Sequence, residues 1–433
     1  MNILSAARFN GSALLNRPRF HRLLCSALTA LVAATALSHM TAVHSYEVDI
    51  QALFRPDPAR PQHNVFTITT PDTGYCRDYT RDCTANNMSS HRVRMRITAN
   101  QPIAAHHTDP RQGPMFSVPT QWRDFQVTHR QTLEQKTVQI RIKGVGGQYE
   151  TSNVVPLVGG GVSAYDAHGK LWGKQWQYAP APCTYTGSGG YNNYVYGFFW
   201  KTPEQGVCAK QAQYDIPTFR YNYLDFAYEL KTPAPLDMSS GEYVGSLSYG
   251  LGPQQDFDMG DLMFPAEPTL RLNVVLTVEH TLKVEVPPGG NHIELVPKDG
   301  WQRWVQTGRM AEKLFRNQTF LISASAPFKM QLHCERVIGD TCALLDNKSL
   351  HEVPLDLYVT LPNGLGREDG SPVNRQPLLL SGVGTQRFIP VRYLDRREGT
   401  LHFEIQKHHV QDMLSRSEGK YSGSVVVIWD SQV

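Results

Sequence analysis

The stretch Gly419-Lys-Tyr-Ser-Gly-Ser-Val-Val-Val-Ile-Trp-Asp430 lies three residues before the end of this 433-residue sequence. Because β-branched and aromatic residues fit the pleated surface of a sheet, residues 421–429 are predicted to form a strand. Residues 425–429 are apolar on both faces, which is typical of a strand inside a core. No later segment of this sequence can pair with the strand's second edge, and nothing in the apolar run protects that edge by charge or proline.

Two interpretations of this strand are open. In the first, it lies between two earlier strands of a complete β-sandwich. In the second, the sandwich is incomplete and another polypeptide lends it a strand, with main-chain hydrogen bonds giving affinity and alternate side chains giving register. The side chains predicted to bind such a partner strand are Tyr421, Val425, Val427 and Trp429.

An internal echo of this stretch suggests two related domains. Gly241-Glu-Tyr-Val-Gly-Ser-Leu-Ser-Tyr249 has Gly, Tyr, Gly and Ser at the same offsets as the C-terminal stretch. A repeat at such a wide separation predicts two related sandwich domains, each closed by the same strand. Further residues follow the first copy in the sequence, so the first domain is expected to complete its own sheet with them.

The rest of the sequence predicts an exported, all-β protein. Four arginines and no acids precede the apolar residues 23–37, and a small-residue cleavage pattern follows, so residues 1–45 are predicted to be a secretory signal peptide. The mature length predicts two domains, which we place at residues 46–268 and 269–433. Residues 172–178 and 301–306 are predicted to be strands, and residues 408–414 a short helix.

The charge of the mature chain argues against nucleic acid as a partner. The full sequence has 42 basic and 39 acidic residues, and removal of the signal leaves 38 basic and 39 acidic residues. The basic character of the full sequence therefore belongs largely to the signal. A nearly neutral mature chain lacks the electrostatic footprint of nucleic-acid binding.

The cysteines predict disulfides. One of the seven, Cys25, lies in the signal, and an even number in an exported chain indicates bridges. Their spacing favours the sequential pairs Cys76 with Cys83, Cys183 with Cys208, and Cys334 with Cys342. Zinc is the weaker alternative, because no C-x-x-C pair or suitably spaced histidine accompanies them.

Signatures of catalysis are weak. The sequence has no nucleophile elbow, metalloprotease helix or P-loop. Asp256, Asp258 and Asp261 could bind calcium, but no EF-hand spacing supports it, and a solvated linker is the competing interpretation. No enzyme activity, cofactor or metal is predicted.

Two features of the first domain suit binding. Side chains alternate between the two faces of a strand, so a strand at residues 92–97 would carry Arg92, Arg94 and Arg96 on one face. The planar guanidinium group of arginine suits carboxylate or sulfate recognition. The competing interpretation is a solvated sheet face with acidic partners on the next strand.

The second feature is the glycine-rich segment between Cys183 and Cys208. Tyrosine, glycine, serine and asparagine make adaptable binding loops, whose aromatic faces also stack on sugar rings. The competing interpretation is a core strand at residues 194–200 with a glycine turn. The two interpretations are compatible, because the turn can be exposed while the strand is buried. The binding residues predicted here are Tyr185, Tyr191, Asn192 and Tyr194.

The glycine, the tyrosine two places later and the alternating terminal strand resemble the last strand of a chaperone–usher pilus subunit. With the signal and the two domains, most of the mature chain resembles a two-domain tip adhesin of a chaperone–usher fimbria, of the colonisation-factor or cable-pilus initiator type. Gln432 stands where that family usually has a penultimate aromatic residue, and Trp429 is a candidate for the same packing.

The resemblance implies two immunoglobulin-like β-sandwiches, the second an incomplete pilin-type sandwich that needs a donor strand. It implies export through the periplasm to the fimbrial tip, where the subunit initiates assembly and mediates adhesion. The implied partners are a periplasmic pilus chaperone, the outer-membrane usher, the adjacent pilus subunit and a host or surface receptor such as a glycan. The alternatives are a non-adhesive structural pilus subunit and a secreted glycan-active enzyme, which would need a paired carboxylate in a cleft.

Overall fold

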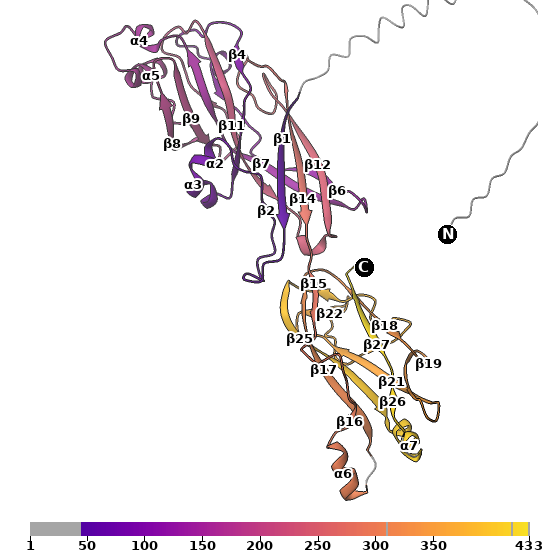
Figure 1. Cartoon of the computed structure of the whole chain (residues 1–433). Helices are drawn as coiled ribbons and strands as arrows, with labels where there is room; N and C mark the ends of the chain where they lie inside the picture. The colour runs from indigo at the N-terminus through magenta and orange to yellow at the C-terminus, as the bar shows by residue number, and fades with distance from the viewer. Residues whose placement is uncertain (1–44, 309–310, 417–418, 432–433) are drawn as a thin grey trace, which may run out of the picture. The chain divides into compact units, whose positions relative to one another are not determined.

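The computed structural model describes residues 45–308, 311–416 and 419–431, without the side chains of residues 303, 304 and 307. The predicted signal peptide lies outside the described residues except for its last position, and Gln432 also lies outside them. None of the described helices is long and apolar enough to cross a membrane. The fold is all-β, with one large hydrophobic core in each domain and a small separate cluster around the Cys76–Cys83 bridge, which confirms the predicted fold class of two β domains (Figure 1).

The first domain is built on one large, curled sheet. Its order is β13-β4-β11-β7-β6-β12-β14-β1-β2, with β3 beside β11, and β9 and then β8 beside β7. The strands are β1 (Ser45–Phe54), β2 (Thr67–Ile68), β3 (Ser89–Val93), β4 (Ile97–Ala99), β6 (Arg123–His129), β7 (Gln135–Thr151), β8 (Thr184–Tyr191), β9 (Val195–Lys201), β11 (Phe219–Lys231), β12 (Gly241–Gly250), β13 (Met263–Pro265) and β14 (Thr269–Val278). A separate pair joins β5 (Met115–Phe116) to β10 (Cys208–Ala209).

The strand β14 corrects the predicted domain boundary. We placed residues 269–278 in the second domain, but all ten residues of β14 pair with β1 in parallel and with β12 in antiparallel register. Its alternate side chains lie in the first core and are at most 2 % exposed: Leu270, Leu272, Val274, Leu276 and Val278. The first sheet therefore ends at Val278, and the next strand begins at Leu282.

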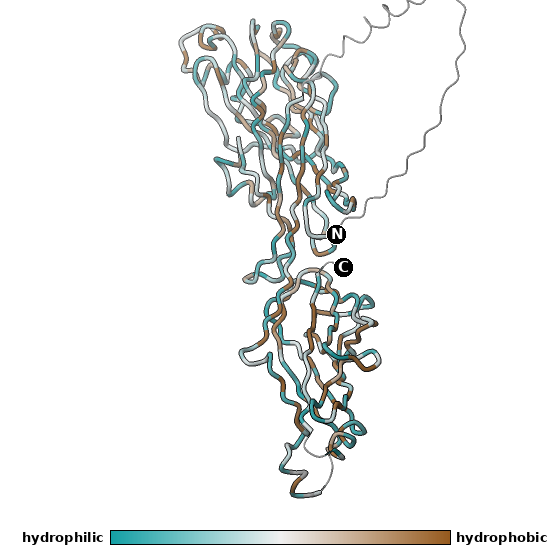
Figure 2. Tube along the Cα trace, turned by 45° about the vertical axis from the view of Figure 1, so that its right-hand side comes forward, coloured by the Kyte–Doolittle hydropathy of each residue, from teal (hydrophilic) through white to brown (hydrophobic). Residues whose placement is uncertain are grey.

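The second domain has its own core and several smaller sheets. One sheet has the order β15-β17-β25-β21-β20-β19, with β16 beside β17, β23 beside β21 and β26 beside β20, while β18 with β27 and β22 with β24 form separate pairs. The strands are β15 (Leu282–Glu285), β16 (Val296–Pro297), β17 (Lys313–Ala324), β18 (Lys329–Cys334), β19 (Val337–Ile338), β20 (Thr341–Asp346), β21 (His351–Thr360), β22 (Leu365–Gly366), β23 (Gln376–Leu378), β24 (Ile389–Pro390), β25 (Leu394–Gln406), β26 (Tyr421–Ser422) and β27 (Val425–Asp430). Many of the apolar residues follow the strands of the two domains, and hydrophilic residues are common in the loops between them (Figure 2).

Several segments form helices where we predicted strands or loops. Residues 172–178 are not a strand: Trp172 is the last residue of α5 (Ala164–Trp172), which begins after the N-cap Ser163 and is followed by Gly173 with a left-handed φ of 73°, and residues 173–178 form bends and a turn. Residues 301–306 lie within the helix α6 (Gly300–Thr307), and the loop between Cys76 and Cys83 contains α2 (Tyr75–Asp78) and α3 (Thr80–Ala85). A fourth short helix, α4 (Val154–Leu157), precedes α5. The helix predicted at residues 408–414 is confirmed as α7 (Lys407–Ser415).

The three predicted disulfides are confirmed. The bridges are Cys76–Cys83, Cys183–Cys208 and Cys334–Cys342, and each closes a loop within one domain. Zinc ligation by these cysteines is therefore wrong, because each thiol is consumed in a bridge.

Candidate functional site

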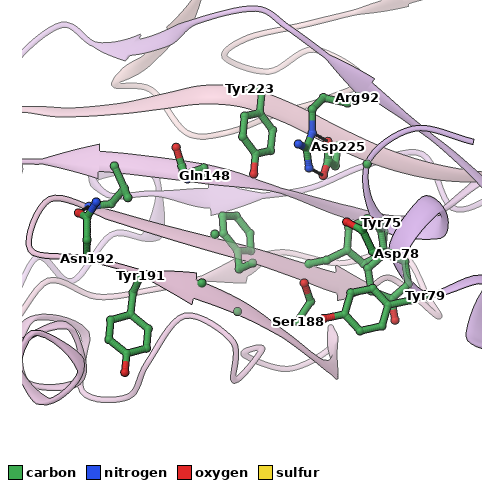
Figure 3. Close-up of a pocket in the computed structure, with 17 residues that line it drawn as sticks. Tyr75, Asp78, Tyr79, Arg92, Gln148, Ser188, Tyr191, Asn192, Tyr223 and Asp225 are labelled. Atoms are coloured by element: carbon green, nitrogen blue, oxygen red, sulfur yellow. Dashed lines mark hydrogen bonds and ion pairs between the residues drawn. The ribbon is translucent and has the colours of Figure 1, made fainter.

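A pocket of about 510 Å³ lies on the first domain and contains side chains from both predicted binding features. Arg92 comes from β3, while Tyr191 and Asn192 come from the end of β8 (Figure 3). Tyr223 and Asp225 of β11 complete the same wall as Arg92. The structure therefore joins two sequence segments that we had treated as alternative sites.

The helix pair between Cys76 and Cys83 forms the other side of this pocket. Tyr75 stacks on Phe199 of β9 at 4.1 Å between ring centroids, and Tyr79 stacks on Tyr75 at 4.7 Å. Phe199 fits against β7 because Gly146 has no side chain; an added Cβ would lie 2.7 Å from its ring. The sequence analysis assigns no role to this wall, although the two tyrosines beside a cysteine pair, Tyr75 and Tyr79, are a usable signal.

Arg92 is held by an acidic partner on the next strand. Its Nε and Nη2 atoms donate to the two carboxylate oxygens of Asp225, each at 2.8 Å, and its guanidinium lies 3.8 Å from the ring centre of Tyr223. Burial raises the pKa of Asp225, and the hydrogen bonds from Arg92 oppose that rise. Arg92 therefore follows the competing interpretation, in which an acid neutralises it.

The three arginines do not lie on one continuous strand. The strand β3 ends at Val93, the N–H of Met95 turns back to donate to the Val93 carbonyl, and β4 begins at Ile97. Burial still alternates, because Val93, Met95 and Ile97 are buried while Arg94 and Arg96 are exposed. Neither Arg94 nor Arg96 lines the pocket.

The tyrosine segment is a hairpin of β8 and β9. The predicted core-strand interpretation holds for β9, where Tyr196 and Trp200 are fully buried, and the binding-loop interpretation fits the exposed Tyr185, Tyr191 and Tyr194. Asn192 shapes the turn, because its Oδ1 accepts hydrogen bonds from the N–H groups of Tyr194 and Val195. These residues separate in space: Tyr185 lines a second pocket of about 430 Å³, and Tyr194 lines neither pocket.

A buried histidine anchors this turn from beneath. His168 of α5 contacts the Asn192 carbonyl through Nε2 at 2.7 Å and the Tyr149 hydroxyl through Nδ1 at 2.5 Å. The Tyr149 oxygen also accepts from Trp172 Nε1. Burial lowers the pKa of His168, so the neutral ring, donating from Nε2 and accepting at Nδ1, satisfies every atom of this network.

The acidic groups of the pocket are already engaged. Both oxygens of Asp225 accept from Arg92, and both oxygens of Asp78 accept from Arg77. This arrangement does not leave the free carboxyl pair that glycoside hydrolysis uses.

The acidic cluster near residue 258 is also engaged. Arg111 bridges Asp258 and Asp261 at 2.8 and 2.6 Å, and Arg123 pairs with Asp256 at 3.2 Å. The cluster is thus tied into the first domain by arginines and is not a solvated linker.

The C-terminal strand is an edge strand. Among the described residues, β27 pairs only with β18, and its side chains alternate between half-buried Val425, Val427 and Trp429 and exposed Val426 and Ile428. The prediction that both faces lie in a core is therefore wrong. The run is also interrupted, because β26 ends at Ser422 and β27 begins at Val425.

The half-buried row on β27 has a counterpart on β15. Leu282 and Val284 of β15 are also half-buried apolar residues at the rim of the second core. β15 pairs with the end of β17, and Phe320 of β17 contacts Trp429 at 5.6 Å between ring centroids. The Nε1 of Trp429 is buried and has no hydrogen-bond partner among the residues that the structure describes. β15 and β27 thus each carry a row of partly covered apolar side chains at the rim of the second core, and we call these two rows the seam.

The comparisons with known proteins find likeness at the level of solved structures. No protein-family model matches the chain, and no curated protein matches it. A point mutant of CfaE, the CFA/I adhesin of enterotoxigenic Escherichia coli, is similar at 10% identity and TM-score 0.25, over 90% of this chain and 95% of that chain. A chain from the CsuC–CsuE chaperone–tip subunit complex of archaic Csu pili of Acinetobacter baumannii is similar at 8% identity and TM-score 0.22, over 89% of this chain and 98% of that one.

A further match is a chain from a chaperone–tip adhesin complex of CFA/I fimbriae, at 10% identity and TM-score 0.22, covering 90% of this chain and 97% of that chain. These three solved structures are thus of a fimbrial adhesin or of complexes of a tip adhesin with its chaperone. Because the identities and TM-scores are low, the functional proposal below rests on the residues of this chain.

Proposed function

We propose that this chain is a fimbrial tip adhesin whose second domain is completed by a strand from a partner. Its first domain binds a receptor, and its second domain accepts a donor strand first from a periplasmic chaperone and then from the adjacent pilus subunit. The chain is exported through the periplasm, passes an outer-membrane usher and acts at the fimbrial tip without enzymatic activity.

The observation that carries the proposal is the contrast between the two echoed strands. In the first domain, β12 is paired along its whole length with β14, a strand later in the same chain, and β14 buries five apolar side chains. In the second domain the equivalent strand β27 pairs only with β18 among the described residues, and its apolar row is left half-buried. A donor strand would pair with β27 as β14 pairs with β12.

The seam predicts the pattern of its donor. A strand added beside β27 presents alternate side chains to the core, so its apolar residues must recur at every second position. The sequence of β14, with Leu, Leu, Val, Leu and Val at alternate positions, supplies that pattern for the first domain. Val425, Val427 and Trp429 are the proposed contacts for the chaperone and the next subunit, and Tyr421 supports the strand through a 2.8 Å contact between its hydroxyl and His351 Nδ1.

The receptor site is proposed at the first pocket and its exposed surroundings. Tyr191, Tyr79 and Tyr223 offer aromatic faces, and polar groups from Arg92, Gln148 and Asn192 lie around them. A concave surface with aromatic faces and a few fixed polar groups is typical of saccharide-sized ligands. Arg94 and Arg96 lie outside the pocket and are proposed as an exposed basic surface that attracts an anionic receptor.

A fusion experiment tests the central proposal. The mature chain is produced with and without a C-terminal linker and a donor peptide carrying apolar residues at alternate positions. The fused protein should be monomeric and should show a second-domain unfolding transition at higher temperature than the unfused chain. A control peptide of the same composition, with its apolar residues made consecutive, should give no gain. Equal stability of all three proteins would show that the second domain needs no donor.

A further inference from the structure

The second pocket of the first domain combines two tyrosines with two lysines. Tyr178 and Tyr185 stack at 5.3 Å between centroids with an interplanar angle of 16°, and both are exposed to solvent. Lys174 and Lys210 line the same pocket, which has a volume of about 430 Å³. It therefore offers a flat aromatic face beside a concentration of positive charge.

The Cys183–Cys208 bridge holds the aromatic and cationic parts together. Tyr185 follows Cys183 by two residues, and Lys210 follows Cys208 by two residues. The two Cα atoms of the bridge are 5.8 Å apart, so these two chain segments are fixed side by side. Each segment is also held by main-chain pairing: Tyr185 pairs with Trp200 of the large sheet, and the N–H of Lys210 donates to the carbonyl of Pro114, the residue before β5.

Lys210 is a buried cation without an acidic partner. The residue is 7% exposed, and in the described ranges its Nζ has two hydrogen-bond partners, the backbone carbonyls of Lys174 at 3.4 Å and Gln175 at 3.3 Å. No carboxylate in the described part of the chain forms an ion pair with it, and Lys174 adds a second positive charge nearby. Because a buried charge is costly unless it is paired, an anion that entered the pocket would stabilise this site.

We propose that this pocket binds the ring-borne anionic group of an acidic saccharide. The carboxylate or sulfate is held by Lys210 and Lys174, and the sugar ring lies on the tyrosine pair. Carboxylate and sulfate present the same acceptor oxygens to an ammonium group, and charge-assisted hydrogen bonds of this kind are the strong ones. The aromatic pair supplies the apolar face and polar tips that suit a ring with both C–H and hydroxyl surfaces.

This inference goes beyond the adhesin proposal. It concerns a pocket that shares no lining residue with the first one, and it concerns binding in solution. Saccharide binding at the second pocket and location at a fimbrial tip are independent, so either could be true without the other.

The test measures binding of defined saccharides to the mature chain by titration calorimetry. The probes are tetragalacturonate, a sulfated galactose tetramer and the neutral galactose tetramer. We expect one or both charged probes to bind at least about tenfold more tightly than the neutral one, and the comparison of the two identifies the anionic group. Lys210→Met and Tyr185→Ala should each weaken that binding by about tenfold or more.

Matched variants separate this site from general charge effects. Lys231→Met removes an exposed lysine at the end of β11 and should leave the affinity unchanged. If Lys210→Met fails to fold, Lys174→Met and Tyr185→Ala still test the site, because both side chains are exposed. Equal binding of charged and neutral tetramers, or unchanged affinity in folded Lys210, Lys174 and Tyr185 variants, would overturn the proposal.

Discussion

Arg92 and Asp225 face each other across β3 and β11 and form a two-pronged ion pair, with both nitrogen-to-oxygen distances at 2.8 Å. The Asp225 side chain is only 6% exposed and that of Arg92 is 28% exposed. The pair thus stabilises the wall of the first pocket. It also lowers the net positive charge of that wall, because Asp225 neutralises Arg92.

Loss of Arg92 should destabilise the first domain. Arg92→Met leaves a buried carboxylate without its partner, which we expect to cost about 3–5 kcal/mol in the free energy of unfolding. Exposed Arg94→Met should change it by less than about 0.5 kcal/mol. Chemical denaturation of the two variants measures both values.

The defect in Arg92→Met should depend on pH. Burial raises the pKa of Asp225, and without Arg92 that rise is unopposed. A carboxyl whose folded-state pKa is raised destabilises the fold once it ionises, so the defect should grow as pH rises from about 4 to 8. A defect of the same size at both ends of this range would contradict the role assigned to the pair.

The length of an isolated first domain decides whether it folds. A fragment ending at residue 268 lacks β14 and its five buried apolar side chains, each contributing about 1.5–3 kcal/mol. Their sum is comparable to the whole stability of a domain, about 5–15 kcal/mol. Residues 45–280 should therefore give a cooperative unfolding transition and residues 45–268 should not, as judged by circular dichroism during heating.

Neighbouring valines on β27 should respond differently to the same substitution. Val427 is half-buried toward the core and Val426 is 51% exposed. In the protein fused to a donor peptide, Val427→Asp should remove most of the thermal gain, because it places a charge against the donor. Val426→Asp should keep the gain, and loss of the gain in both variants would indicate a general defect of the strand.

Salt should distinguish the two receptor surfaces of the first domain. Exposed arginines are screened over about 8–10 Å at physiological ionic strength, whereas aromatic stacking is far less sensitive to salt. If the receptor is anionic, adhesion should fall with added salt and with Arg94→Ala or Arg96→Ala. Loss in Tyr191→Ala that persists at every salt concentration assigns recognition to the pocket instead. Adhesion unchanged in all three folded variants would exclude both surfaces.

Acid should weaken the turn that carries Asn192. The pKa of His168 is lowered by burial, so its neutral form is the stabilising one, and that contribution is complete above the unfolded value of about 6.5 and is lost as pH falls. Protonation would turn Nδ1 into a donor facing Tyr149, whose oxygen already accepts from Trp172. The stability loss between pH 7 and pH 5 should be smaller in His168→Gln than in the parent protein. An identical loss in both would assign the acid sensitivity to other groups.

The sequence alone was enough to predict the features that depend on residues close to one another in the chain. The three disulfides follow from short spacings in an even set of cysteines. The alternation of Val93, Met95 and Ile97 follows from the pleat of an extended chain, and it persisted even though the strand broke at Arg94. Both glycine–tyrosine stretches form strands, the first as β12 and the second as β26 and β27.

The features that tertiary structure decided all depend on which strand lies beside which. The residues of β14 have the same alternation whether they open the second domain or close the first, and only their pairing with β1 and β12 assigns them. Asp225 lies 133 positions from Arg92, so no local pattern predicts that it neutralises that arginine. Tyr185 and Tyr191 belong to one segment, yet β8 carries them to different pockets, while the bridge brings Lys210 to Tyr185. Periodicity fixes which face a side chain takes, but the identity of the neighbour on that face is set by long-range packing.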